Sequence, residues 1–135
     1  ELEDLRFGWY AAAVLRSNST AIVKDGCLIS PGTGQQARVA SVVESIRKVD
    51  DLNRLAEEEG IGDERRRIFD YSLEGSVLAS EALFPYPDSV EAIGPRGITA
   101  IAQTGGSNRD AEVIASADKY NLAMVFTGER SFSHH

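Results

Sequence analysis

Asn18 and Arg38 are two side chains whose types and positions suit ligand chemistry. Asn18 lies in Ser17-Asn18-Ser19, where an N-terminal helix should end, so its amide could contact a ligand or cap that helix. Arg38 follows the glycine-rich segment 32–37, in which backbone N–H groups could face an anion. The Arg38 guanidinium could donate to a phosphate or a carboxamide oxygen, or form a surface salt bridge. Both interpretations stay open for each residue.

Three later segments also carry suitable residue types. Phe84–Asp88 combines two prolines, two aromatic rings and a carboxylate, a rigid platform that suits a flat heterocycle but would also suit packing under a loop. Gln103–Ser107 joins an expected strand to an expected helix, a geometry that favours anions. Arg130–Phe132 offers a cation beside a ring, which could clamp a nucleotide or belong to a solvated tail.

Patterns of several common catalytic sites are missing from the sequence. It has no Gly-x-Ser-x-Gly, no Gly-x-x-x-x-Gly-Lys and no His-Glu-x-x-His, which excludes ordinary hydrolase triads and Walker-type nucleotidases. The two histidines are His134 and His135, and Cys27 is the single cysteine. A zinc deaminase needs His-x-Glu and Pro-Cys-x-x-Cys, so this sequence cannot supply that metal site, and no metal is expected.

Size and charge limit the remaining classes of function. The chain has 135 residues, 42% of them hydrophobic, which predicts one domain with a real core. The net charge of −7 disfavours nucleic acid as a partner but allows a small anion. The single cysteine suits a reducing cytoplasm, and no apolar run approaches the roughly 20 residues that span a membrane. We therefore expect a cytoplasmic protein with neither a membrane nor a nucleic-acid partner.

These side chains must be positioned by an α/β fold. Apolar residues from Leu2 to Ala13 repeat at helical spacing and predict a helix that stops near residues 17–19. Residues 20–23 and 26–29 flank a Lys-Asp-Gly turn and predict a β-hairpin. A second helix follows from the spacing of Val39, Val42, Val43 and Ile46. Residues 44–70 hold 15 charged side chains, a density that predicts a solvated, peripheral helix or surface insertion.

The second half alternates strands with helices. Residues 76–79, 98–102 and 122–126 are predicted strands, and Ser89 is predicted to cap a short helix that ends at Gly94-Pro95. Ser107 and Asp110 form a capping-box-like start for another helix, which should stop at Asn121. This order predicts a three-layer α-β-α architecture, with a mixed sheet that is antiparallel in the hairpin and parallel later.

Six blocks, taken in order, resemble one known family, the C-terminal part of AICAR transformylase. That part belongs to the formyltransferase portion of a bifunctional purine-biosynthesis enzyme that also has an IMP cyclohydrolase domain. The resemblance covers nearly the whole chain outside residues 50–71, and it is carried by residues 17–19, 24–26, 32–38, 75–88, 103–114 and 126–132. It implies a single cytidine-deaminase-like subdomain over residues 1–135, with a charged insertion at about 50–71.

The resemblance also implies an activity and a site. Family members transfer a formyl group from 10-formyltetrahydrofolate, a co-substrate, to the amine of 5-aminoimidazole-4-carboxamide ribonucleotide (AICAR), without a metal in the chemical step. Asn18 would be the catalytic residue, and Arg38, Leu83, Arg130 and Phe132 would contact the nucleotide. Pro85, Tyr86 and Asp88 would face the folate.

Some residues depart from the family pattern. Leu83 replaces a Phe that faces the nucleotide, Glu81 replaces the usual Asp and Tyr86 replaces Phe. The family's catalytic Lys-His pair belongs to an upstream subdomain that is not in this sequence. We therefore expect a homodimer or pairing with a complementary upstream half. The alternative is a non-catalytic nucleotide-binding or oligomerisation module derived from the same fold.

Overall fold

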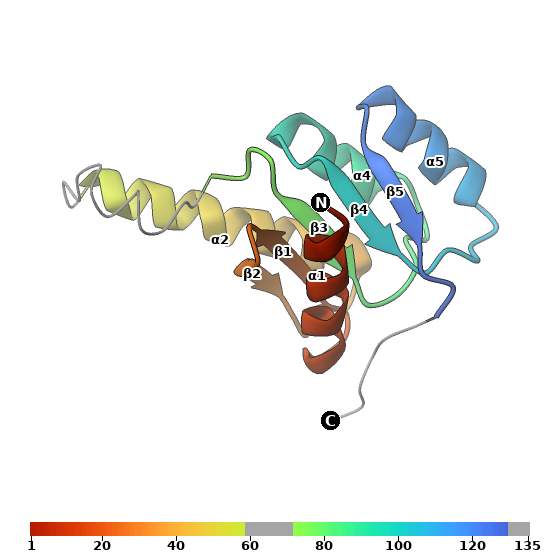
Figure 1. Cartoon of the computed structure of the whole chain (residues 1–135), viewed down its shortest axis with the longest axis horizontal. Coiled ribbons are helices and arrows are strands. Elements are labelled where there is room, and N and C mark those ends of the chain that lie inside the picture. Colours follow the sequence, from red (N-terminus) through yellow and green to blue (C-terminus); the bar gives the residue numbers. More distant parts are fainter. Residues whose placement is uncertain (59–71, 130–135) are drawn as a thin grey trace.

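One five-stranded sheet organises the described residues, 1–58 and 72–129, of the computed structural model (Figure 1). Its strands lie in the order β2-β1-β3-β4-β5. Their bounds are β1 (Thr20–Lys24), β2 (Cys27–Gly32), β3 (Val77–Ser80), β4 (Ala100–Gln103) and β5 (Ala123–Phe126). β1 is antiparallel to both β2 and β3, whereas β3, β4 and β5 are parallel. The predicted hairpin and the predicted parallel half are both confirmed.

Helices cover both faces of this sheet, which confirms the predicted three layers. Helix α1 (Leu2–Val14) packs on one face, and α2 (Arg38–Glu58), α4 (Asp88–Ile93) and α5 (Asp110–Lys119) pack on the other (Figure 1). Neighbouring strand residues point to opposite faces. Ile22 and Leu78 therefore join the larger core cluster under α2 and α4, while Val23 and Val77 join the smaller cluster under α1.

The N-terminal helix forms as predicted but ends earlier than residues 17–19. Leu15 already has an extended conformation, and its N–H donates to the carbonyl of Ala12. Leu5 and Ala12 face the sheet, but Leu2 is 64% exposed. The apolar repeat therefore overestimates the buried length of the helix at both ends.

Helix α2 extends into the charged segment. It is 21 residues long, and Ile46, Val49 and Ala56 are among its buried residues, while its exposed residues include both charged and apolar side chains. The predicted charged helix is thus confirmed up to Glu58, although one of its faces belongs to the core. Residues 59–71, the rest of the predicted insertion, lie outside the described residues.

The helix that follows the Phe84–Asp88 platform corrects one prediction. Ser89 does not cap it, because the helix begins at Asp88 and Ser89 lies buried in its first turn. The Asp88 carboxylate instead accepts a hydrogen bond from the Ser89 N–H, at 2.8 Å. The end of the helix is as predicted, since α4 stops at Ile93 before Gly94-Pro95, and Gly94–Arg96 then form a 3-10 turn. None of the described helices is long and apolar enough to cross a membrane.

Small side chains allow α2 to approach the hairpin closely. A Cβ placed on Gly32 would lie 2.0 Å from the carbonyl oxygen of Ser41, a backbone atom that cannot rotate away. We predict that Gly32→Ala lowers the free energy of unfolding by about 3 kcal/mol or more, because the helix must shift. Gly26→Ala is the control, since its Cβ meets nothing within 4 Å and the cost is only the strain of φ +75°, about 1 kcal/mol. Urea unfolding of both variants measures the difference, and equal costs would contradict the close packing.

Candidate functional site

The antiparallel pairing of β1 and β3 brings two predicted site segments together. Thr20, the first residue of β1, pairs with Ser80, the last residue of β3. Asn18 therefore lies beside the segment that begins at Glu81. The first residue of α2, Arg38, reaches the same edge of the sheet. Open α/β sheets commonly bind ligands outside the carboxyl ends of their parallel strands, which is where β3 ends here.

A pocket of about 550 Å³ opens at this junction. Its lining includes six of the predicted site residues, which are Asn18, Arg38, Leu83, Pro85, Tyr86 and Asp88. The rest of its described lining consists of Gln36, Ala37, Val39 and Ala82. Arg130 and Phe132, the other predicted contacts, lie outside the described residues. The structure thus brings together every predicted site residue that it describes.

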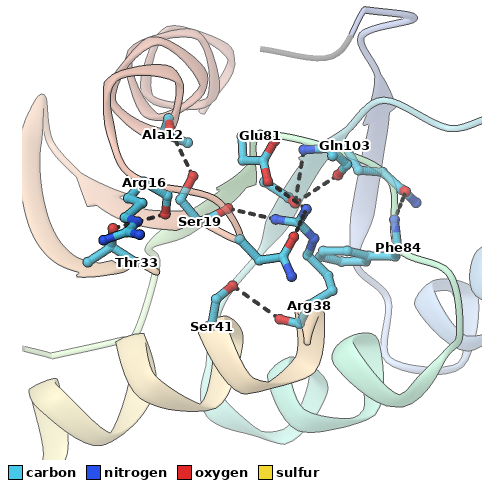
Figure 2. Close-up of polar contacts among 12 residues, drawn as sticks. Ala12, Arg16, Ser19, Thr33, Arg38, Ser41, Glu81, Phe84 and Gln103 are labelled. Carbon is cyan, nitrogen blue, oxygen red and sulfur yellow. Dashed lines mark hydrogen bonds and ion pairs between the residues drawn. The ribbon is translucent and has the colours of Figure 1, made fainter. Parts of the chain in front are cut away.

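Arg38 forms a buried ion pair rather than the surface salt bridge considered from the sequence. Its Nη2 lies 2.6 Å from Oε1 of Glu81, and the two side chains are 6% and 0% exposed (Figure 2). Its Nη1 donates to the carbonyl of Ser19 at 3.0 Å, and Nη2 also donates to Oδ1 of Asn18 at 2.9 Å. Burial of this kind requires a charged partner, and Glu81 provides it.

Asn18 is held by backbone and side-chain contacts and does not cap α1. Its N–H donates to the carbonyl of Gln35 at 3.0 Å, and its Nδ2 donates to the carbonyl of Gln36 at 2.9 Å. With Oδ1 bonded to Arg38, both ends of the side-chain amide are fixed. The side chain is partly exposed and lines the pocket.

The Phe84–Asp88 platform divides between core and pocket. Phe84 is fully buried, and its N–H donates to Oε1 of Gln103 at 2.7 Å (Figure 2). Tyr86 is 52% exposed, and the guanidinium of Arg109 lies 5.1 Å from its ring centroid. Both sequence interpretations therefore apply, one to each ring: Phe84 packs in the core, and Tyr86 lines the pocket.

In the two loops expected to bind anions, several backbone N–H groups already donate to groups of this protein. In the first loop, Gly34 N–H donates to the carbonyl of Arg16, and Thr33 N–H donates to the Glu44 carboxylate. In the second, Gly106 and Ser107 N–H groups donate to the Asp110 carboxylate at 2.7 and 3.1 Å. The predicted geometry exists at the second loop, but its anion is a side chain of this protein.

Sequence reasoning missed the role of Glu81. It noted this residue only as a departure from a family pattern. A signal was nevertheless present, since Glu81 directly follows the buried strand 77–80 and is itself followed by apolar residues. A carboxylate inside such a run needs a charged or strongly donating partner. Among the described residues, no group of three or more His, Cys, Asp and Glu side chains could hold a metal ion.

Comparisons relate the chain to known proteins whose names refer to purine biosynthesis. Residues 1–48 match the family model of the AICARFT/IMPCHase bienzyme. The bifunctional purine biosynthesis protein PurH of Rhodopirellula baltica is 43% identical over 132 residues, and that of Dinoroseobacter shibae is 45% identical over 134. The alignments cover 98% and 99% of this chain but only 21% and 23% of those proteins. The chain is related to PurH. It spans about a fifth of the length of these relatives.

Solved structures share the fold at low sequence identity. A deaminase/reductase of Thermotoga maritima, diaminohydroxyphosphoribosylaminopyrimidine deaminase/5-amino-6-(5-phosphoribosylamino)uracil reductase, aligns with a TM-score of 0.53 and 15% identity over 93% of this chain and 33% of its own. Acinetobacter baumannii RibD aligns with a TM-score of 0.52 and 13% identity, over 93% of this chain and 32% of its own. The cytidine-deaminase-like fold expected from the sequence is thereby confirmed.

Glu44 of this PurH-related chain ties the first loop to α2. Its carboxylate accepts hydrogen bonds from Thr33 N–H and from Gln35 Nε2, and Lys48 Nζ lies 3.3 Å away. Partial burial raises the pKa of Glu44, but these hydrogen bonds and the Lys48 charge outweigh burial, so the pKa lies below its usual value. The ionised form is therefore the one that stabilises the fold.

We predict that Glu44→Gln destabilises the protein by about 1 kcal/mol at pH 7. Because the folded pKa is lowered, the contribution is complete above the unfolded-state pKa and disappears as the pH falls through the folded pKa. The difference between wild type and Glu44→Gln in urea unfolding should therefore vanish in acid. Glu91→Gln, at an exposed position of α4, is the control. A constant difference at every pH would contradict the assignment.

Proposed function

We propose that this chain is part of an AICAR transformylase and contributes binding groups for AICAR and for 10-formyltetrahydrofolate. The observation that carries this proposal is the single pocket that gathers Asn18, Arg38, Leu83, Pro85, Tyr86 and Asp88. These residues come from separate blocks of the resemblance and are up to 70 positions apart in the sequence. Residues without a shared role would not be expected to line one pocket.

A relative of this bifunctional enzyme could belong to its formyltransferase or to its IMP cyclohydrolase portion. Two observations favour the formyltransferase. Three of the six blocks that carry the resemblance to AICAR transformylase contribute described residues to the pocket lining. That resemblance also implies a cytidine-deaminase-like subdomain, and the fold of the chain is of this kind. Neither observation depends on the cyclohydrolase portion of the relatives.

The chemistry of the lining suits the proposed ligands. The Asn18 amide can both donate to and accept from the carboxamide or the amine of the nucleotide. Arg130 would bind an anionic or carbonyl oxygen, and Phe132 would stack on the imidazole ring. Leu83 would contact the nucleotide, and Pro85, Tyr86 and Asp88 would face the folate.

Formyl transfer requires proton handling that the described pocket does not supply. The amine of AICAR attacks the formyl carbon, the carbon bond to N10 of the folate breaks, and the proton lost by the amine ends on N10. Tyr86, Arg38 and Asp88 are the ionisable side chains in the described lining, and none is a histidine or lysine. A general base would accelerate the reaction by about 10² to 10⁴-fold. We propose that this base comes from a homodimer partner or from a complementary upstream half. The reaction would take place in the cytoplasm.

The lack of a histidine or lysine in the described pocket lining also favours a second candidate, a nucleotide-binding or oligomerisation module without catalysis. Leu83 supports it as well, because an aliphatic side chain lines the pocket where the family usually has a Phe. The two candidates differ in activity and not in their binding residues.

Ligand binding tests the site. We predict that AICAR binds the chain and that Asn18→Ala and Arg130→Ala each weaken binding by about tenfold, the value of one or two hydrogen bonds to a charged or polar group. Isothermal titration calorimetry measures the dissociation constants. Arg54→Ala, an exposed residue of α2 outside the pocket lining, is the control. Equal or absent heats in wild type and in both variants would leave the proposed site without support.

Activity tests the assignment to the formyltransferase. We predict that Rhodopirellula baltica PurH without the region that matches this chain loses formyl transfer and keeps IMP cyclohydrolase activity. Adding the 135-residue chain should restore formyl transfer, while the chain alone should give at most trace turnover. Loss of the cyclohydrolase activity instead would contradict the proposal. Robust turnover by the chain alone would contradict the need for a partner.

A further inference from the structure

At the edge of the pocket, one guanidinium nitrogen of Arg38 donates to two other residues, Glu81 and Asn18. Nη2 of Arg38 donates both to Oε1 of Glu81, at 2.6 Å, and to Oδ1 of Asn18, at 2.9 Å. We propose that Glu81 and Arg38 are positioning residues that fix which end of the Asn18 side-chain amide is donor and which is acceptor. This inference rests on the proposed function in one respect, namely that Asn18 contacts the ligand.

The contacts of Asn18 specify one of its two amide orientations. A guanidinium can only donate, so it must face the amide oxygen. The carbonyl of Gln36 can only accept, and it lies 2.9 Å from Nδ2. Turning the amide by 180° would place donor against donor and acceptor against acceptor. The assignment therefore follows from the chemistry of the neighbours, independently of how the two amide atoms are distinguished.

Glu81 fixes the guanidinium in turn. Its side chain is fully buried, and its backbone N–H donates to the carbonyl of Ser19, which also accepts from Nη1 of Arg38 (Figure 2). Arg38 is thus held at two nitrogens by groups that belong to the ends of β1 and β3. Arg38 itself lines the pocket with its side chain 6% exposed, and the positioning role proposed here concerns its contact with Asn18.

The fixed orientation has a consequence for ligand class. The Asn18 oxygen has a second lone pair and its nitrogen a second hydrogen, so the amide keeps one acceptor site and one donor site for a ligand. A carboxamide offers the complementary pair. A carboxylate in the same place offers acceptors only and would leave the Asn18 oxygen facing another oxygen. The Glu81–Arg38–Asn18 chain therefore selects a carboxamide against a carboxylate.

The first test needs no ligand. In the ¹⁵N-labelled 135-residue chain, the Asn18 side-chain NH₂ signals, assigned by their loss in Asn18→Ala, should exchange with solvent about tenfold or more slowly than those of a free asparagine. The double variant Arg38→Met/Glu81→Leu removes both buried charges together, which avoids leaving one unpaired. It should remain folded and lose this protection. Glu81→Gln keeps an acceptor oxygen for Arg38 and should retain it.

The control removes an exposed pair from the same helix. Arg54 and Asp51 are 64% and 52% exposed, and Asp51→Leu/Arg54→Met should leave the Asn18 signals unchanged. Unprotected Asn18 signals in the folded wild type would overturn the proposal, whether or not the double variant folds. Unchanged protection in a folded Arg38→Met/Glu81→Leu protein would overturn it as well.

The second test measures selectivity by calorimetry. Wild type should bind AICAR about tenfold or more tightly than the corresponding 4-carboxylate ribonucleotide, and the double variant should lose this preference. A preference that persists in the double variant would overturn the selectivity argument. If neither nucleotide binds, the proposed function fails, while the exchange experiment still decides how Asn18 is held.

Discussion

The buried ion pair between Arg38 and Glu81 connects the three parts of the chain that form the pocket. Arg38 is the first residue of α2, and Glu81 directly follows β3. The Arg38 side chain and the Glu81 backbone N–H both donate to the carbonyl of Ser19, which directly precedes β1. A buried pair of this kind contributes little net stability, because desolvation offsets the attraction, but removal of one partner typically costs about 3–5 kcal/mol. Its role is therefore to specify geometry. Neither buried charge would be tolerated unless the start of α2 and the end of β3 lie close enough for Arg38 and Glu81 to pair.

The sheet explains how residues distant in the sequence meet at that point. Antiparallel pairing of Thr20 with Ser80 places the beginning of one strand against the end of another. The small serine side chains of α2 then let the helix lie close to β1 and β2. Thr20 Oγ1 donates to the carbonyl of Ser41 at 3.1 Å, and the backbone of Gly32 packs against the same carbonyl. Close helix packing and strand register together place Arg38 within reach of Glu81, so the pocket depends on the core beneath it.

Sequence patterns predicted the elements better than their limits and their side-chain partners. Apolar periodicity and the Lys-Asp-Gly turn predicted α1, the hairpin and the parallel strands, because these depend on local spacing. The same patterns could not show that α1 ends at Val14 or that Asp88, and not Ser89, begins α4, because apolar spacing and capping signals locate a helix end only approximately. The resemblance to a family named six of the ten described residues that line the pocket. It gave no reason for Glu81, whose importance appears only when Arg38 is found buried beside it.

Under the proposed function, binding and proton transfer are carried out by different groups. Asn18 holds hydrogen-bonding groups in fixed directions, and an amide neither gains nor loses a proton at ordinary pH, so it can orient a reacting amine without acting as its base. Fixed dipoles of this kind stabilise developing charge at no reorganisation cost, provided that they are held rigidly. The ion pair beneath Asn18 supplies that rigidity within this chain. A general base, by contrast, must exchange protons with solvent or substrate, and a buried, charge-paired environment hinders that exchange. The physical demands of the two tasks differ, which gives a reason for a site of this type to be divided between separate folding units.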